Sequence, residues 1–316
     1  PHVRSRGPAD ENAWQGGAEN HDPATEGDWS ARKTAALTAY REWMPVSEAP
    51  WRSYEIGSLA TIAMPETRIT ARTRQLDLGA ALAGQADIPA ALAAFRDGPW
   101  QDPARTLFGL AQERWLFDLM AQSVRAGTRW QVLAQQVVMG SLRSPPELAD
   151  WMPANLPPAV AQRVQVAIAA SRAGLPANFD SWDGYPAARA RLLGAMQAAG
   201  ANLVVLSGDS HNGWAYDLAH DGRPAGVEFA GHSVTSPGFE TYIPVAPATL
   251  ADALRRTNPT LKWADTSRRG YVAVTLTPER AEARWRLWND VRSAGAPMAD
   301  EAMMSTRPGA NQLEPI

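Results

Sequence analysis

The stretch that most constrains the fold is an apolar run, Leu203 to Leu206, which is followed closely by Gly208-Asp209-Ser210-His211. A short, unbroken apolar run that is β-branched in its middle predicts a strand buried on both faces of a sheet. Gly208 lets the chain turn sharply as it leaves the sheet. Asp209 and His211 are then expected at the C-terminal end of this strand, where open α/β sheets keep their binding sites.

An Asp oxygen and a His nitrogen separated by one residue can point into the same crevice. Such a pair suits a metal ion, or a general base together with the carboxylate that orients it. The structural alternative is that Asp209 caps the next turn and that His211 is a hydrogen-bonded core histidine. We favour the functional interpretation, because the chain has only five histidines and this one follows a predicted strand.

Composition limits the remaining possibilities. The formal net charge of the 316 residues is -3, so the chain has no bulk attraction to nucleic acid. No apolar run approaches the roughly 20 residues of a membrane span. The sequence contains no cysteine, which excludes disulfides and thiolate ligands within this chain and leaves histidines and carboxylates as ligands. The sequence begins at Pro1 with neither an initiator Met nor a signal-peptide core, so we expect a removed leader or a start within the gene.

The spacing of apolar residues predicts an α/β chain. Residues 1–28 are rich in Gly, Pro and acidic residues and are expected to form an extended loop. Helices are predicted at 29–44, 110–125, 187–199 and 248–256, with shorter helices within 69–105 and 144–178. Strands are predicted within 52–64 and over 130–139, and hairpins around Asp221-Gly222 and Pro278-Glu279. A single domain over residues 1–316 is the simplest organisation.

Three further segments offer candidate binding residues. Arg68 follows a predicted strand and either faces a phosphate or forms a surface ion pair. In the Trp182–Pro186 segment, Asp183 either caps the next helix or lines the wall of a cleft together with Tyr185. The segment beginning Gly231-His232-Ser233 carries hydroxyl and backbone N–H groups that could hold an oxyanion, or it is a tight loop without a ligand.

Gly208-Asp209-Ser210 also admits a serine-esterase interpretation, in which Ser210 is the nucleophile. Esterases of the Gly-Asp-Ser type use a distant Asp-x-x-His near the C-terminus. Apart from the adjacent His211, only His220 and His232 follow Ser210. Asp217-Leu218-Ala219-His220 has the required spacing but lies close to Ser210 rather than near the C-terminus, so this is the weaker alternative. His21 lies in a polar, glycine-rich loop, where a lone histidine is more often structural.

Several of these stretches together resemble one family in the right order along the chain. The chain resembles the PhoD-type alkaline phosphatases, a branch of the metallophosphoesterases. The resemblance rests on residues Asn12 to His21, Glu66-Thr67-Arg68, Trp182 to Pro186, Leu206 to Asn212, Ser233 to Gly238 and Arg268 to Tyr271. Glu66 stands where the family has Asp.

The resemblance implies a metallophosphoesterase-like β-sandwich of two sheets flanked by helices. It implies hydrolysis of phosphate monoesters or diesters by water or hydroxide activated on calcium and iron or related ions. In that pattern Asp209 and His211 match the last metal-ligand motif, while His232 or Ser233 contacts the phosphate. Members of the family are commonly exported, which implies a periplasmic or secreted protein that acts on a small phosphate ester.

The chain departs from the family in its first part. The family's early ligand motifs, a Gly-Ser-Cys strand end, a Gly-Asp-x-x-Tyr loop and a Trp-Asp-Asp-His-Glu segment, have no counterpart here. We therefore expect the N-terminal strands of the sandwich to be missing, which exposes a sheet edge. Either another segment or a second chain completes the site, or the chain is an impaired fragment or pseudo-enzyme that acts as a binding module.

Overall fold

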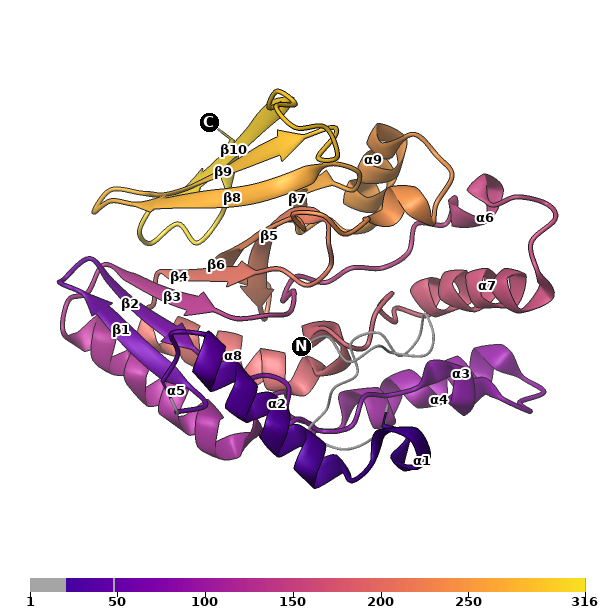
Figure 1. The fold of residues 1–316 in the computed structure, drawn as a ribbon, viewed down its shortest axis with the longest axis horizontal. Helices are drawn as coiled ribbons and strands as arrows, with labels where there is room; N and C mark the ends of the chain where they lie inside the picture. The colour runs from indigo at the N-terminus through magenta and orange to yellow at the C-terminus, as the bar shows by residue number, and fades with distance from the viewer. Residues whose placement is uncertain (1–20, 48, 316) are drawn as a thin grey trace.

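The computed structural model describes residues 21–47 and 49–315. These residues form two β-sheets and a set of helices, arranged in layers with the smaller sheet above the larger one and helices below (Figure 1). The expected α/β class with two sheets flanked by helices is confirmed. The part of the first matching motif that lies before His21 is outside the described residues, as are residues 1–20 of the loop predicted over 1–28. In the described part of that loop, the short helix Pro23–Glu26, capped by Asp22, interrupts the expected extended chain.

The larger sheet has seven described strands in the order β1-β2-β3-β4-β6-β5-β7. Strands β2, β3, β4 and β6 are mutually parallel, and β1 and β5 run antiparallel to them. Strand β7 is antiparallel to β5 and so shares the direction of β6. The strands are β1 (Arg52–Ile56), β2 (Ala60–Met64), β3 (Trp130–Ala134), β4 (Leu203–Ser207), β5 (Gly213–His220), β6 (Arg223–Ala230) and β7 (Leu261–Asp265).

The smaller sheet is antiparallel throughout its described strands, in the order β11-β10-β9-β8. Its strands are β8 (Arg269–Leu276), β9 (Ala281–Trp288), β10 (Asp300–Thr306) and β11 (Glu314–Pro315). Apolar residues of β8 and β9 face the larger sheet, and Trp285 packs against both Phe229 and Trp263. The alternation of side chains along the antiparallel strands therefore builds one core layer between the two sheets.

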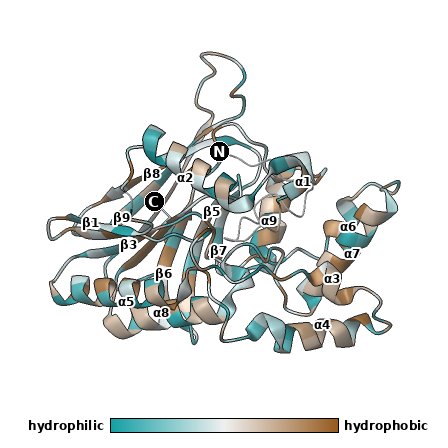
Figure 2. Cartoon of the chain, turned by 60° about the horizontal axis from the view of Figure 1, so that its bottom comes forward, coloured by the Kyte–Doolittle hydropathy of each residue, from teal (hydrophilic) through white to brown (hydrophobic). Residues whose placement is uncertain are grey.

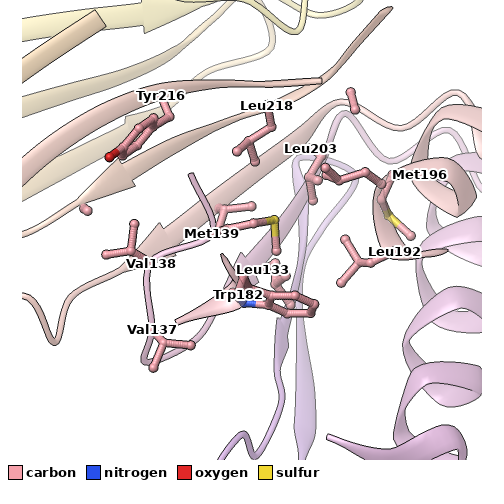
Figure 3. Close-up of a cluster of buried hydrophobic side chains, with 14 of the residues drawn as sticks. Leu133, Val137, Val138, Met139, Trp182, Leu192, Met196, Leu203, Tyr216 and Leu218 are labelled. Carbon is pink, nitrogen blue, oxygen red and sulfur yellow. The ribbon is translucent and has the colours of Figure 1, made fainter. Parts of the chain in front are cut away.

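The packing of strand β4 on both of its faces explains why its sequence is an unbroken apolar run. Leu203 and Val205 pack against the helices, whereas Val204 packs into the layer between the sheets. The helical side of this core also includes Leu133, Met139 and Trp182, which Figure 3 shows converging with Leu192 and Met196. A strand with a hydrophobic core on each face has no solvent-facing side on which a polar residue would be stable.

Helices α5 and α8 lie side by side along the lower face of the larger sheet (Figure 2). A second group, α3, α4 and α7, forms a separate apolar cluster at the end of the molecule where α6 also lies. The described α-helices are α1 (Pro23–Glu26), α2 (Trp29–Trp43), α3 (Leu78–Leu82), α4 (Ile88–Asp97), α5 (Gly109–Arg125), α6 (Leu148–Trp151), α7 (Pro158–Arg172), α8 (Pro186–Ala199) and α9 (Pro247–Thr257). Three short 3-10 helices are η1 (Pro99–Gln101), η2 (Trp182–Gly184) and η3 (Phe239–Thr241).

Most predicted elements match, and two further expectations are wrong. The predicted hairpins are confirmed as β5–β6 and β8–β9. The strand predicted over 130–139 ends at Ala134. Residues 135–139 are a loop, and its apolar residues Val137, Val138 and Met139 are buried by packing under the sheet rather than by pairing within it. Gly208 was expected to make the turn, but its backbone needs no glycine; the left-handed residues are Asp209 and His211.

Strand β1 lies at one edge of the larger sheet, and its residues from Ser53 to Ile56 are exposed. An open sheet always has edge strands, so the expectation that N-terminal strands are missing stays a prediction. No described helix combines the length and apolar character that crossing a bilayer requires.

Candidate active site

The candidate residues gather because of strand direction. The parallel strands β2, β4 and β6, together with β7, end at the same edge of the larger sheet, the one formed by the carboxyl ends of these strands. Arg68 follows β2, Asp209 and His211 follow β4, His232 follows β6, and Asp265 ends β7. A parallel sheet thus delivers to one edge residues that are far apart in the sequence, as expected for a site in an α/β protein.

The turn after β4 is held in an unusual backbone conformation. Asp209 and His211 adopt φ values of 68° and 61°, in the left-handed region that costs a non-glycine residue about 1–3 kcal/mol. Asn212 supports the turn, because its side chain donates to Ser210 O at 2.6 Å and accepts from Phe239 N at 3.0 Å. The surroundings therefore fix a strained turn that presents an acid and a histidine together.

The His211 ring is oriented by a backbone carbonyl. Its Nδ1 lies 3.0 Å from Pro237 O, and a carbonyl can only accept, so Nδ1 carries the proton. The lone pair is then on Nε2. Metal-bound histidines are commonly oriented in this way, through a hydrogen bond from the nitrogen that does not bind the ion.

Asp209 shares a cation with a second carboxylate. Arg68 Nη2 lies 3.5 Å from Asp209 Oδ1, and Arg68 Nη1 lies 2.7 Å from Asp180 Oδ1. Burial raises the pKa of Asp209, Arg68 opposes that shift, and Asp180 adds to it. Burial alone would lower the pKa of the Arg68 guanidinium, but Asp180 and, after it, Asp209 raise it. The structure thus brings together Arg68 and Asp209, two of the predicted site residues.

Glu66 and Thr67 position Arg68. The Glu66 carboxylate accepts from the backbone nitrogens of Arg68 at 2.6 Å, Ile69 at 2.8 Å and Thr70 at 2.7 Å. Thr67 Oγ1 donates to Gln136 Oε1 at 2.5 Å, and Gly208 N donates to Gln136 O at 3.1 Å. Gln136 therefore ties the turn that bears Arg68 to the turn that bears Asp209.

The Trp182–Pro186 segment is buried rather than exposed in a cleft wall. Asp183 accepts from Ser141 Oγ, Leu142 N and Arg189 Nη1 at 2.7–2.8 Å, and no side chain caps α8. The capping interpretation of Asp183 is therefore wrong, because two distant donors, Ser141 and Leu142, and the Arg189 side chain take its oxygens. Tyr185 is fully buried, and its hydroxyl donates to Thr73 O at 2.6 Å.

His232 and Ser233 are also held by internal contacts. The His232 side chain has no exposed area, and its Nε2 lies 3.2 Å from Asp265 Oδ1. Burial alone would raise the pKa of Asp265, but hydrogen bonds from His232 and Arg268 hold it well below its usual range. Ser233 Oγ donates to Ser236 O. These two residues lie at the same sheet edge, and neither is bonded to Asp209 or His211 within the described residues.

Ser210 is not arranged as a nucleophile. Its Oγ accepts from Trp214 Nε1 at 2.7 Å and donates to Asn212 O at 3.3 Å. Among the described residues, no histidine nitrogen is hydrogen-bonded to it. His21, which we expected to be structural, contacts Gly27 O at 2.6 Å and Arg32 Nη1 at 3.0 Å.

The sequence interpretation missed several buried acids, among them Asp265 and the two described next, Asp180 and Glu228. Asp180 gave no signal of its own apart from its place two residues before Trp182. Glu228 did give a signal, since it is a charged residue inside the apolar run Val227-Glu228-Phe229-Ala230. It is completely buried and accepts from Ser207 Oγ, Met139 N and Gly140 N, each at 2.7 Å.

The sequence pattern of the PhoD-like phosphatases matches residues 9–285. The chain belongs to this family. Alkaline phosphatase D of Bacillus subtilis (strain 168) is 29% identical over 286 residues, which are 86% of this chain and 41% of that protein. The solved structure of PhoD superposes with a TM-score of 0.68 and 26% identity, covering 98% of this chain and 53% of that one.

The match to PhoD extends through nearly the whole chain, which confirms the family resemblance and the two-sheet fold. The chain spans about two fifths of the length of the curated PhoD-type relative. Within the described residues, no group of three or more His, Cys, Asp or Glu side chains is placed to hold one metal ion. Asp209 and His211 carry side chains of the kinds that bind metals, and no third such side chain joins them among the described residues.

Proposed function

We propose that this chain takes part in the metal-dependent hydrolysis of phosphate esters. The observation that carries the proposal is the meeting of Arg68, Asp209 and His211 at one sheet edge in a member of the PhoD-like phosphatase family. This edge offers a cation for phosphoryl oxygens, a carboxylate and an oriented imidazole. Each of these groups is suited to phosphate chemistry, and two of them stand in a strained turn of the kind found at functional sites.

In this proposal Asp209 and His211 are the protein ligands of the ion. His211 offers Nε2 while Pro237 O holds its Nδ1 proton. Calcium and iron are the proposed ions, by family resemblance; a carboxylate suits either ion, and an imidazole suits iron. When bound, the metal would polarise the phosphoryl group and activate the attacking oxygen.

The other candidate residues receive more limited roles. Arg68 binds the non-bridging oxygens of the substrate, because guanidinium N–H groups match the geometry of phosphate. Ser233 and His232 line the same edge, with His232 held by Asp265. Asp183 and Tyr185 hold the loops that carry the site. The proposed substrate is a small phosphate ester, and by family resemblance the protein works in the periplasm or outside the cell.

The second candidate is a binding module without turnover, an impaired fragment or pseudo-enzyme. It is favoured by one observation: Asp209 and His211 are fewer ligands than a multi-metal site needs, and the described residues supply no third member. A further segment or a second chain would complete the ligand set in the enzymatic proposal. The two candidates differ in turnover, while both predict that inorganic phosphate binds near Arg68.

A substrate comparison tests the reaction class. We expect the chain, supplied with calcium and iron, to release nitrophenol from p-nitrophenyl phosphate faster than from p-nitrophenyl acetate. Ser210→Ala should retain that activity and lose on the order of 1–2 kcal/mol of stability, because the hydrogen bonds of Ser210 Oγ with Trp214 Nε1 and Asn212 O are removed. Phosphate binding without turnover would favour the binding module. Loss of acetate hydrolysis alone in Ser210→Ala would favour the serine esterase.

A further inference from the structure

Asp180 lies behind the site and binds two arginines with one oxygen. Its Oδ1 lies 2.7 Å from Arg68 Nη1 and 2.7 Å from Arg72 Nη2. The carboxylate is almost completely buried, and its side chain is only 7% exposed. Two guanidinium groups therefore converge on one acid that water hardly reaches, so these ion pairs are screened much less than surface pairs.

Arg72 makes this arrangement rigid. Its side chain has no exposed area, its Nε donates to Tyr185 Oη at 3.0 Å, and its Nη2 also donates to Asp180 O. The Arg72 guanidinium lies 5.1 Å from the centre of the Tyr185 ring. Asp180 is thus fixed through both its backbone and its side chain, and it offers a firm attachment for Arg68.

Two contacts of the Arg68 guanidinium differ in length. The contact of Nη1 with Asp180 is 2.7 Å, a strong charge-assisted bond, whereas the contact of Nη2 with Asp209 is 3.5 Å. A competing group would displace the weaker contact first. If a cation binds Asp209 and neutralises its charge, Arg68 Nη2 can turn its N–H groups to an anion while Nη1 stays hydrogen-bonded to Asp180.

The local charges also suit an anion. Arg68 and Arg72 carry two positive charges against the negative charges of Asp180 and Asp209, so this group becomes cationic once a bound cation neutralises Asp209. Asp180 Oδ2 is buried and has no hydrogen-bond partner among the described residues. An unsatisfied buried oxygen costs free energy. Stability alone therefore does not explain why an acid occupies this position.

We propose that Asp180 is a positioning residue that holds Arg68 so that its Nη2 faces the phosphoryl oxygens of the substrate. This inference rests on the proposed function and adds to it a residue that touches neither substrate nor metal. The ligand class is a tetrahedral oxyanion, with inorganic phosphate as its simplest representative. Asp180→Asn keeps the shape of the side chain while removing the charge that attaches Nη1.

The first readout is independent of phosphate. Side-chain nitrogen NMR of the full chain, with the Arg68 signals assigned by their loss in Arg68→Lys, reports how freely the guanidinium rotates. We expect separate, slowly exchanging Nη signals for Arg68 in the parent and averaged signals in Asp180→Asn. Glu113→Gln is the matched control. Glu113 is a buried acid whose Oε1 lies 2.7 Å from Arg191 Nη2, and this ion pair is not part of the site.

The second readout is the affinity for inorganic phosphate, measured by titration calorimetry with calcium present. We expect Asp180→Asn to bind phosphate at least about tenfold more weakly than the parent, the loss of one well-placed charged hydrogen bond, while Glu113→Gln binds like the parent. Should Asp180→Asn not fold, Asp180→Glu keeps the charge but displaces the carboxylate by one methylene. Its phosphate affinity is then expected to fall below that of the parent.

The outcomes separate the positioning role of Asp180 from the proposed function. Identical Arg68 signals in the parent and Asp180→Asn overturn the positioning role, and so does an unchanged phosphate affinity. If the Arg68 signals change but the parent itself binds no phosphate, Asp180 does position Arg68 and the proposed function fails instead. An equal loss of phosphate affinity in Glu113→Gln would show a general effect of destabilisation and would also overturn the proposal.

Discussion

Glu228 is a carboxyl group with no exposed surface in the middle of the larger sheet. It joins Ser207, the last residue of β4, to the backbone of the loop at Met139 and Gly140. Burial raises its pKa to about 7, against the three hydrogen bonds, which lower it. A single residue thereby connects the strand that bears Asp209 to the loop under the sheet.

This raised pKa makes stability depend on pH in a defined direction. Below the ordinary pKa of 4.5 both folded and unfolded chains hold the proton. Between 4.5 and about 7 only the unfolded chain ionises, so the free energy of unfolding falls as pH rises, by on the order of 3 kcal/mol from this group. Above about 7 both states are ionised and this contribution no longer changes.

Glu228→Gln should remove that dependence. We expect urea denaturation to show a smaller decrease in stability between pH 4.5 and 7 for Glu228→Gln than for the parent, although the variant loses one acceptor and is less stable at low pH. Glu279→Gln, in the exposed turn between β8 and β9, is the control and should follow the parent. Parallel curves for the parent and Glu228→Gln would contradict the assignment.

At the scale of elements, the segment from Phe179 to Pro186 holds the loops of the site in place. Trp182 donates to Gln135, Asp183 holds the loop at Ser141 and Leu142, and Tyr185 supports Arg72. The tight path of this segment needs a residue without a Cβ at position 184. A Cβ there would lie 1.9 Å from Phe179 O, which is backbone and has no freedom to rotate away.

Gly184→Ala should therefore destabilise the protein by about 1–3 kcal/mol, since the backbone of the segment must shift. Gly208→Ala is the matched control, because a Cβ at Gly208 meets nothing within 4 Å and its backbone is not left-handed. Urea midpoints measure both. A midpoint for Gly184→Ala equal to that of Gly208→Ala would show that the segment is not closely packed.

Elements that bury a regular apolar face were predictable from the sequence, and elements held by distant polar contacts were not. The run at Leu203 and the hairpin at Asp221-Gly222 have local signals, and both predictions are confirmed. The loop after Ala134 looked like a strand because its apolar residues are buried, although Glu228 and Trp182 hold it in a non-strand path. The capping interpretation of Asp183 is wrong because two of its donors, Ser141 and Leu142, lie about 40 residues away in the sequence, where no local pattern points to them.

At the scale of the whole molecule, the direction of the strands explains why the candidate site residues lie together. The parallel strands bring Arg68, Asp209 and His232 to one edge, and this arrangement followed from the predicted α/β class. The chain spans 53% of the solved PhoD chain, and its described residues include no group of three or more His, Cys, Asp or Glu side chains placed to hold a metal ion. That one domain spans residues 1–316, and that another segment completes the site, stay predictions.

The central claim is that Asp209 and His211 hold a catalytic metal. The most direct measurement is p-nitrophenyl phosphate turnover, with metal content, after chelation and after return of calcium and iron. Matched pairs are Asp209→Asn with Asp221→Asn, both left-handed aspartates, and His211→Gln with His220→Gln. We predict that the metal restores turnover in the parent and both controls, and in neither site variant. Metal-restored turnover that is equal in all five proteins would contradict the account.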